Sequence, residues 1–411
     1  MLVWNNRWMA LAAKQSEKSR QTDLKVAQSA ARAVHSVGVD QMALTRVAAD
    51  AGFSSGAIYA RCDDRSELVV LAWEKSFWPM LSEILVLMID GVTKHTDEQL
   101  PHLSELFLQA CSPDAVPDLG SAMEVIIASR RDEVIGEVVQ RDFNKLLDDY
   151  GVGPSTDGAM RQHIVASIST LMGAALLNTT YNAEGQKHVN PSDLLIIFAQ
   201  SWKYPTKPAI SSTIRKIPRQ YEIPTTHDDV RDALITATEY VISRSGVHRA
   251  TVSRIARRAG VSVGAIYGIY ENKEALVSDC LEVLFPPQNK RDVEDWIPVF
   301  TATDQRSVLT DILSNYMSPS YEQWRRFRLE CLVAARHSPP ILDQLVVYAT
   351  RARKALVVAA AKAPSAALIR PSTGLSARAT VLGLSIFEII DPTIRQLDWR
   401  WLPINRGPSD T

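Results

Sequence analysis

The chain has 411 residues, of which 46% are hydrophobic and 22% charged, and its formal net charge is −1. This composition is typical of a globular protein, and the length exceeds one ordinary core, so we expect two or more domains. No uninterrupted apolar run is long enough to cross a bilayer, and polar residues interrupt the apolar N-terminus too often for a signal peptide. We therefore expect a cytoplasmic protein with no membrane partner.

The N-terminal half is predicted to form an arm followed by one helical unit. Residues 1–20 carry scattered basic side chains, which suit an arm that reaches a DNA backbone. Residues 21–72 contain FSSGAIYARCDDRSEL, from Phe53 to Leu68, and are predicted to be a first helix-turn-helix domain. Residues 73–204 have helical periodicity and are predicted to be a second, larger helical domain of this unit.

Residues 205–225 are predicted to be a linker between two similar units. The stretch Lys203–Pro224 contains four prolines and five basic residues, and proline at this density stops helices. Residues 226–284, with VSVGAIYGIYENKEAL from Val261 to Leu276, are predicted to be a second helix-turn-helix domain. Residues 285–411 are predicted to be the larger helical domain of the second unit. The expected fold class is all-α throughout, with two tandem units.

Two pairs of similar segments, separated by nearly the same number of residues, indicate that the chain is a duplication. Ala57-Ile58-Tyr59 recurs as Ala265-Ile266-Tyr267 at an offset of 208, and the match is ungapped over the surrounding glycines and alanines. EVIIASR, from Glu124 to Arg130, recurs as ECLVAAR, from Glu330 to Arg336, at an offset of 206. Internal repeats of this length indicate two complete structural units in succession.

The second copy has the local signals of a helix-turn-helix. Thr251 is a good N-cap for a short helix, Gly260 permits the left-handed conformation that ends it, and Ser262 caps the next helix. Ile266 then faces inward and Tyr267 outward. In this geometry the second helix enters the major groove of DNA and presents its N-terminal residues to the base edges.

The run from Thr251 to Leu276, TVSRIARRAGVSVGAIYGIYENKEAL, resembles the DNA-binding signature of the TetR family of transcriptional regulators. The resemblance implies phosphate contacts from Tyr267 and Lys273, a cap from Thr251, and a groove-facing surface. It also implies double-stranded DNA and a small-molecule effector as partners, and helical regulatory domains in residues 73–204 and 285–411. The four cysteines and eight histidines show no metal-ligand spacing, so we expect no metal and no cofactor. The DNA-binding residues expected in the second unit are Thr251, Arg254, Ser262, Val263, Gly264, Tyr267, Gly268 and Lys273.

The first copy departs from this signature. Ala43 stands at the position of Thr251, Cys62 at that of Tyr270, and Arg65 at that of Lys273. Residues 244–273 carry six positive and one negative side chain, whereas residues 36–65 carry three and four, so the second unit should bind phosphate more strongly. The DNA-binding residues expected in the first unit are Arg46, Ser54, Ser55, Gly56, Tyr59, Arg61 and Arg65.

The duplication leaves two assemblies open. One chain acts as an intramolecular pseudo-dimer on an operator with unlike half-sites, or two chains form a homodimer with four DNA-binding units. Helices over Met160–Asn178 and Ser376–Ile390, rich in small residues, are candidates either for an interface between units or for internal core.

A DNA-binding, ligand-responsive repressor is the function that the resemblance implies. The eight histidines lack an H-x-x-x-H or H-E-x-x-H arrangement, so we expect no enzyme and no catalytic residue. The alternative is an interaction or adaptor protein in which one or both DNA-binding units are degenerate, which the near-neutral first unit permits. The ligand-binding residues, the effector and the operator sequence are not predicted.

Overall fold

The computed structural model describes residues 17–94, 97–156, 158–181, 221–285, 313–361 and 371–399. Within these ranges every regular element is a helix, which confirms the all-α prediction. The N-terminal arm predicted for residues 1–20 lies outside the described residues up to residue 16, and residues 17–20 already belong to the first helix. The predicted linker, residues 205–225, lies outside them up to residue 220.

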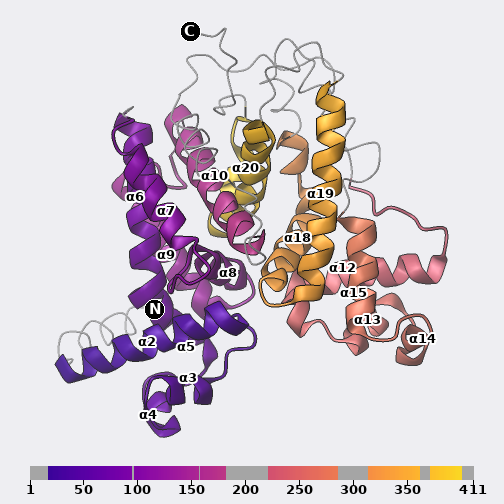
Figure 1. Cartoon of the computed structure of the whole chain (residues 1–411), viewed down its shortest axis with the longest axis horizontal. Helices are drawn as coiled ribbons and strands as arrows, with labels where there is room; N and C mark the ends of the chain where they lie inside the picture. The colour runs from indigo at the N-terminus through magenta and orange to yellow at the C-terminus, as the bar shows by residue number, and fades with distance from the viewer. Residues whose placement is uncertain are drawn as a thin grey trace.

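The first half of the chain forms a small three-helix unit followed by longer helices (Figure 1). Its elements are α2 (Glu17–Val37), α3 (Leu44–Asp50), α4 (Ser55–Tyr59), α5 (Arg65–Ala72), the π-helix η1 (Trp73–Phe77), α6 (Trp78–Lys94), α7 (Leu100–Ala110), α8 (Leu119–Ser129), α9 (Glu133–Asp149) and α10 (Ala159–Tyr181). Side-chain caps begin many of them, because a short polar residue satisfies a free N–H of the first turn. Asp118, for example, accepts from the N–H of Ser121 at the start of α8.

The described helices of the second half follow an order similar to that of α2 to α5 and α8 to α10. Its described elements are α12 (Asp229–Arg249), α13 (Val252–Ala259), α14 (Val263–Tyr267), α15 (Lys273–Leu284), the 3₁₀ turn η3 (Pro319–Tyr321), α18 (Glu322–Ala335), α19 (Pro339–Ala361), α20 (Pro371–Ile390) and the 3₁₀ turn η5 (Pro392–Gln396). In Figure 1 the two small units, with α4 and α14, lie toward the lower edge of the molecule, and the longer helices rise above them.

Helices α10 and α20, one from each half, lie side by side along the middle of the molecule (Figure 1). Glycines permit this close approach: a Cβ atom built on Gly173 would lie 1.9 Å from the carbonyl oxygen of Ala379, and one on Gly383 would lie 1.5 Å from that of Ser169. The hydroxyls of Thr170 and Thr380 are 2.7 Å apart across the same contact. The two candidate packing helices of the sequence therefore pack against each other, as the interface between the halves.

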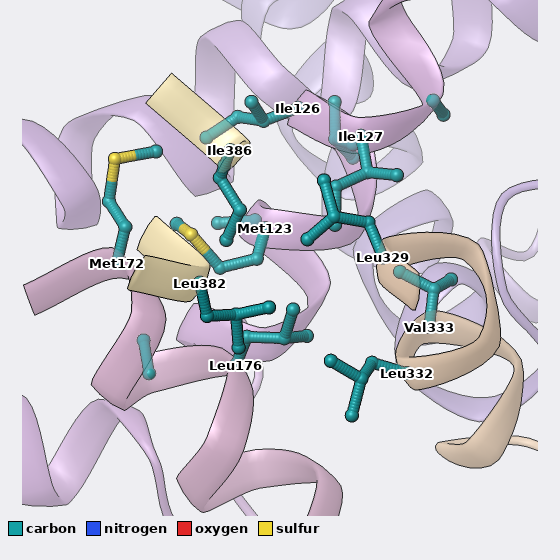
Figure 2. Packing of buried hydrophobic residues seen from close by; sticks show 14 of the residues in the cluster. Met123, Ile126, Ile127, Met172, Leu176, Leu329, Leu332, Val333, Leu382 and Ile386 are labelled. Carbon is teal, nitrogen blue, oxygen red and sulfur yellow. The ribbon is translucent and has the colours of Figure 1, made fainter. Parts of the chain in front are cut away.

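Two more helices complete this shared core. In Figure 2 the side chains of α8 and α10 interdigitate with those of α18 and α20, so each half contributes two helices. Met123, Leu176, Leu329 and Leu382 are all buried there, each less than 4% exposed to solvent. Because the apolar surface of each half is covered by the other half, most of this contact depends on both halves being folded.

The repeated EVIIASR and ECLVAAR segments form ion pairs crosswise. Arg130 Nη2 lies 2.9 Å from Glu330 Oε1, and Arg336 Nη1 lies 3.0 Å from Glu124 Oε2. The next residues follow the same rule, because Arg131 Nε pairs with Glu330 at 3.2 Å and His337 Nε2 with Glu124 at 2.7 Å. Corresponding residues of the two halves thus exchange partners, which is the pattern of a two-fold isologous interface.

A continuous helical rod joins the first small unit to the core. α5, η1 and α6 run without interruption from Arg65 to Lys94, so the predicted boundary between residues 72 and 73 falls inside a helix. At the π-helix, the ring N–H of Trp73 donates to Asp142 Oδ2 at 2.9 Å, while Trp73 and Phe77 are fully buried. These aromatic side chains are therefore core residues.

Two helical stretches have the length and composition of a membrane span, contrary to the expectation that none would. They are Arg65–Lys94 and Ala159–Tyr181. Small neutral residues keep the mean hydropathy of the second stretch high although no long purely apolar run exists. Its most apolar window is 94% buried inside the protein, as expected for a core helix that packs between two halves.

Candidate nucleic-acid interface

The second small unit is a helix-turn-helix whose bounds follow from its sequence. Thr251 Oγ1 accepts from the N–H of Arg254 at 3.3 Å and begins α13. Gly260 has a φ of +74°, a left-handed conformation that favours glycine, and ends the helix there. Ser262 Oγ then accepts from the N–H of Ala265 at 3.0 Å and begins α14. The turn between them is therefore short and fixed by hydrogen bonds at both ends.

This turn leaves one face of α14 open to solvent. Ile266 is 1% exposed and fixes the helix to the core of the unit, whereas Tyr267 on the opposite side is 55% exposed. Arg254 on α13 is also exposed, and its guanidinium donates to the Arg249 carbonyl at 3.2 Å. The remaining predicted groove-facing residues are exposed as well: Ser262, Val263, Gly264 and Gly268.

Lys273, predicted to contact phosphate, has intramolecular partners. Its Nζ donates to the carbonyl oxygen of Val247 at 2.9 Å, at the end of α12, and burial lowers the pKa of the ammonium. In the first unit Arg65 has the same role, because its Nη1 donates to the carbonyl oxygen of Asp40 at 2.5 Å. Lys273 therefore connects the start of α15 to the end of α12, and Arg65 connects the start of α5 to the turn that follows α2.

The first small unit has the same helix order with different chemistry. Ala43 precedes α3 without a side-chain cap, while Ser54 caps α4 by accepting from the N–H of Ala57. Arg61 lies just after α4, not on it, and its Nε donates to Asp23 at 3.0 Å. The predicted contact residues on its outer face are exposed: Arg46, Ser54, Ser55, Gly56 and Tyr59.

Cys62 shows the largest chemical difference between the units. It is 2% exposed, and burial, with Glu67 adding to it, raises the pKa of the thiol to about 11. At the equivalent position the hydroxyl of Tyr270 donates to Asp279 Oδ2 at 2.6 Å, and Arg231 donates to the same carboxylate at 2.8 Å. The second unit thus has a polar network at a position where the first has an inert apolar contact.

Paired substitutions on the outer surface contribute to the difference in charge between the units. In the second unit the guanidiniums of Arg258 and Arg244 lie 3.8 and 4.6 Å from the ring centroid of Tyr240. At the positions of Tyr240 and Arg258 the first unit has Arg32 and Asp50, which form an ion pair at 2.7 Å. An aromatic ring binds a guanidinium and leaves its positive charge in place, whereas a carboxylate neutralises that charge. Apart from the charge count, no pattern in the sequence indicates this stacking.

The first helix of each unit ends on the crosswise ion pairs. A Cβ atom on Gly38, at the end of α2, would lie 2.6 Å from Glu124 and 2.9 Å from His337. One on Gly246, at the corresponding kink in α12, would lie 3.0 Å from Glu330 and 3.1 Å from Arg131. The backbone N–H of Val39 also donates to Glu124 Oε1 at 2.7 Å. Each helix-turn-helix unit therefore touches both halves of the shared core.

Exchanging the caps of α3 and α13 should change local stability in opposite directions. We expect Thr251→Ala to destabilise α13 by about 1 kcal/mol, because the N–H of Arg254 loses its acceptor, and Ala43→Thr to stabilise α3 by a similar amount. Hydrogen exchange of the backbone amides in each helix measures both effects. Unchanged exchange in both variants would contradict this description of the caps.

The outer faces of α4 and α14 are thus arranged as in a DNA-reading helix-turn-helix, with the stronger positive charge on the second unit. No curated protein matches the chain. One family model does match: residues 234–280, which span most of α12, all of α13 and α14 and most of α15, match the bacterial regulatory proteins of the tetR family. The helix-turn-helix of the second unit is therefore similar to that of the TetR family, and this match supports a DNA-binding transcriptional regulator.

Proposed function

We propose that this protein is a ligand-responsive repressor in which two covalently linked TetR-like units act as a single-chain pseudo-dimer on an operator with unlike half-sites. Residues 21–72 and 226–284 are the DNA-binding domains in this proposal, and residues 73–204 and 285–411 are the regulatory domains. The linker replaces association between two chains by association within one chain.

The observation that carries this proposal is the reciprocal contact between the halves. Glu124 pairs with Arg336 and Glu330 with Arg130, and α10 packs on α20 through Gly173 and Gly383. A homodimer of a single TetR-like unit would bring the same positions together from two chains. Because the surface is already covered within one chain, we propose one chain, not two, on each operator.

Release by an effector is proposed from the position of the first helices. Gly38 and Gly246 rest on the ion pairs of the shared core, so a change in that core alters the support of both units. An effector shifts the protein away from DNA only if it binds the DNA-incompetent arrangement more tightly. We propose a small molecule that binds within one or both regulatory domains.

Binding to the DNA of its own promoter region tests the proposal, at two salt concentrations and with the bound mass measured. Tyr59→Ala and Tyr267→Ala should each weaken a salt-sensitive complex of one chain per duplex by about tenfold, the loss of about 1.4 kcal/mol expected for a charged hydrogen bond. Val347→Ala, an exposed position on α19, is the matched control and should leave affinity unchanged.

Two other results of this binding experiment would contradict the proposal. If only Tyr267→Ala weakens binding and two chains occupy the duplex, the first unit is a scaffold and the pseudo-dimer proposal is wrong. If no salt-sensitive complex forms, the adaptor alternative replaces the regulator. The specific observation that favours this alternative is the first unit, where Arg32 is neutralised by Asp50 and Arg61 by Asp23.

A further inference from the structure

The recognition helix of the second unit exposes apolar side chains at its two ends. Val263, its first residue, is 37% exposed, and Ile269, just beyond its end, is 49% exposed, with Tyr267 between them. In the first unit Ser55 and Arg61 occupy the positions of Val263 and Ile269. The apolar surface is therefore a property of one unit only.

The charge around this apolar surface indicates what covers it. Arg254, Arg257 and Arg258 are exposed on α13, the helix that precedes α14, and residues 244–273 carry six positive side chains against one negative. A partner of complementary chemistry presents apolar groups framed by anionic ones. The major groove of duplex DNA has this form, because the C5-methyl groups of thymine project between two rows of phosphates.

Val263 is placed to meet such a methyl group. It follows Ser262 directly, at the end of the recognition helix that faces the base edges in this type of motif. A valine side chain has no hydrogen-bonding group, so a base edge that presents only donors or acceptors would lose water without a replacement partner. Thymine alone offers an apolar contact in the major groove.

We propose that Val263 reads the methyl group of a thymine, and that Ser55 leaves the equivalent position of the other half-site without this requirement. The inference rests on the proposed function and adds the chemistry that makes the two half-sites unlike. The hydroxyl of Ser55 donates or accepts a hydrogen bond and is compatible with more than one base.

Replacement of thymine by uracil in a duplex tests this, because uracil lacks only the methyl group. The duplex is first selected from random sequences by the wild-type chain, and each thymine is then replaced in turn. We expect one replacement, in one half-site, to weaken wild-type binding about fourfold, the value of one buried methyl group at about 0.8 kcal/mol. Val263→Ser should bind the thymine and uracil duplexes equally well.

The reciprocal variant is the matched control. Ser55→Val should create a new dependence on thymine in the opposite half-site, and duplexes with thymine or uracil at the equivalent position of that half-site measure it. Both substitutions are at exposed positions, so thermal unfolding should be unchanged. If the wild type selects a specific duplex but uracil affects wild type and Val263→Ser alike, this inference is overturned while the regulator proposal stands. If no specific duplex is selected, the proposed function itself fails.

Discussion

Replacing Gly383 by valine is expected to destabilise the protein by about 3 kcal/mol or more, at the upper end of the range for overpacked cores. Even the Cβ atom would lie 1.5 Å from the carbonyl oxygen and 2.4 Å from the carbonyl carbon of Ser169. Backbone atoms cannot move to another rotamer, so α10 and α20 must separate. Their separation uncovers the shared core of Figure 2, where Met123, Leu176 and Leu382 are buried.

Denaturant unfolding and small-angle X-ray scattering measure this effect. Gly383→Val should unfold at a lower denaturant concentration, and its radius of gyration should increase as the halves separate. Gly264→Ala is the control, because a Cβ atom there would lie 3.7 Å from Ser262 Oγ, an ordinary contact, and alanine favours a helix. An unchanged midpoint for Gly383→Val would show that α10 and α20 do not approach as described.

The second large effect is expected from Glu330→Ala. The carboxylate of Glu330 is 2% exposed and lies between the guanidiniums of Arg130 and Arg131, which are 13% and 9% exposed. Removing this carboxylate takes an ion-pair partner from both Arg130 and Arg131, which are largely buried. Arg131 still pairs with Asp40 at 2.8 Å. Breaking a buried ion pair on one side costs about 3–5 kcal/mol, and we expect a loss of stability in this range.

Two further glutamate substitutions distinguish the loss of this ion pair from a general loss of negative charge. Glu124→Ala should cost less, because Arg336 retains Asp118 at 2.9 Å and the hydroxyl of Ser121 at 3.1 Å. Glu137→Ala, at an exposed position on α9, should have almost no effect. A double-mutant cycle with Arg130→Ala measures the coupling directly. Equal losses for Glu330→Ala and Glu137→Ala would contradict the crosswise pairing.

Local signals in the sequence were sufficient to predict the helix-turn-helix. Thr251, Gly260 and Ser262 each act within three to five residues of their own position, so their roles as caps and turn are readable without tertiary structure. Tyr267 was correctly predicted to face outward, because Ile266 next to it has to be buried. The DNA contacts of these residues stay predictions.

Tertiary contacts were much less predictable. The sequence showed that Glu124–Arg130 and Glu330–Arg336 are repeats, but not that each glutamate pairs with the arginine of the other copy. Lys273 and Arg65 are predicted to contact phosphates, and that stays a prediction; the sequence did not indicate that Lys273 also donates to the carbonyl of Val247 and Arg65 to that of Asp40. A lysine or arginine side chain is long enough to reach either a phosphate or a backbone carbonyl. The tertiary position of the helix ends determines which carbonyl groups lie within its reach.

The crosswise pairing has a consequence for the genetics of this protein. In an assembly of two identical subunits, every substitution is introduced twice and alters both symmetry-related contacts. Here Glu124–Arg336 and Glu330–Arg130 are encoded separately, so a single codon change removes one contact and leaves its counterpart intact. Two unlike subunits encoded by separate genes would also assemble in mixed combinations, whereas every molecule of this chain contains one copy of each half.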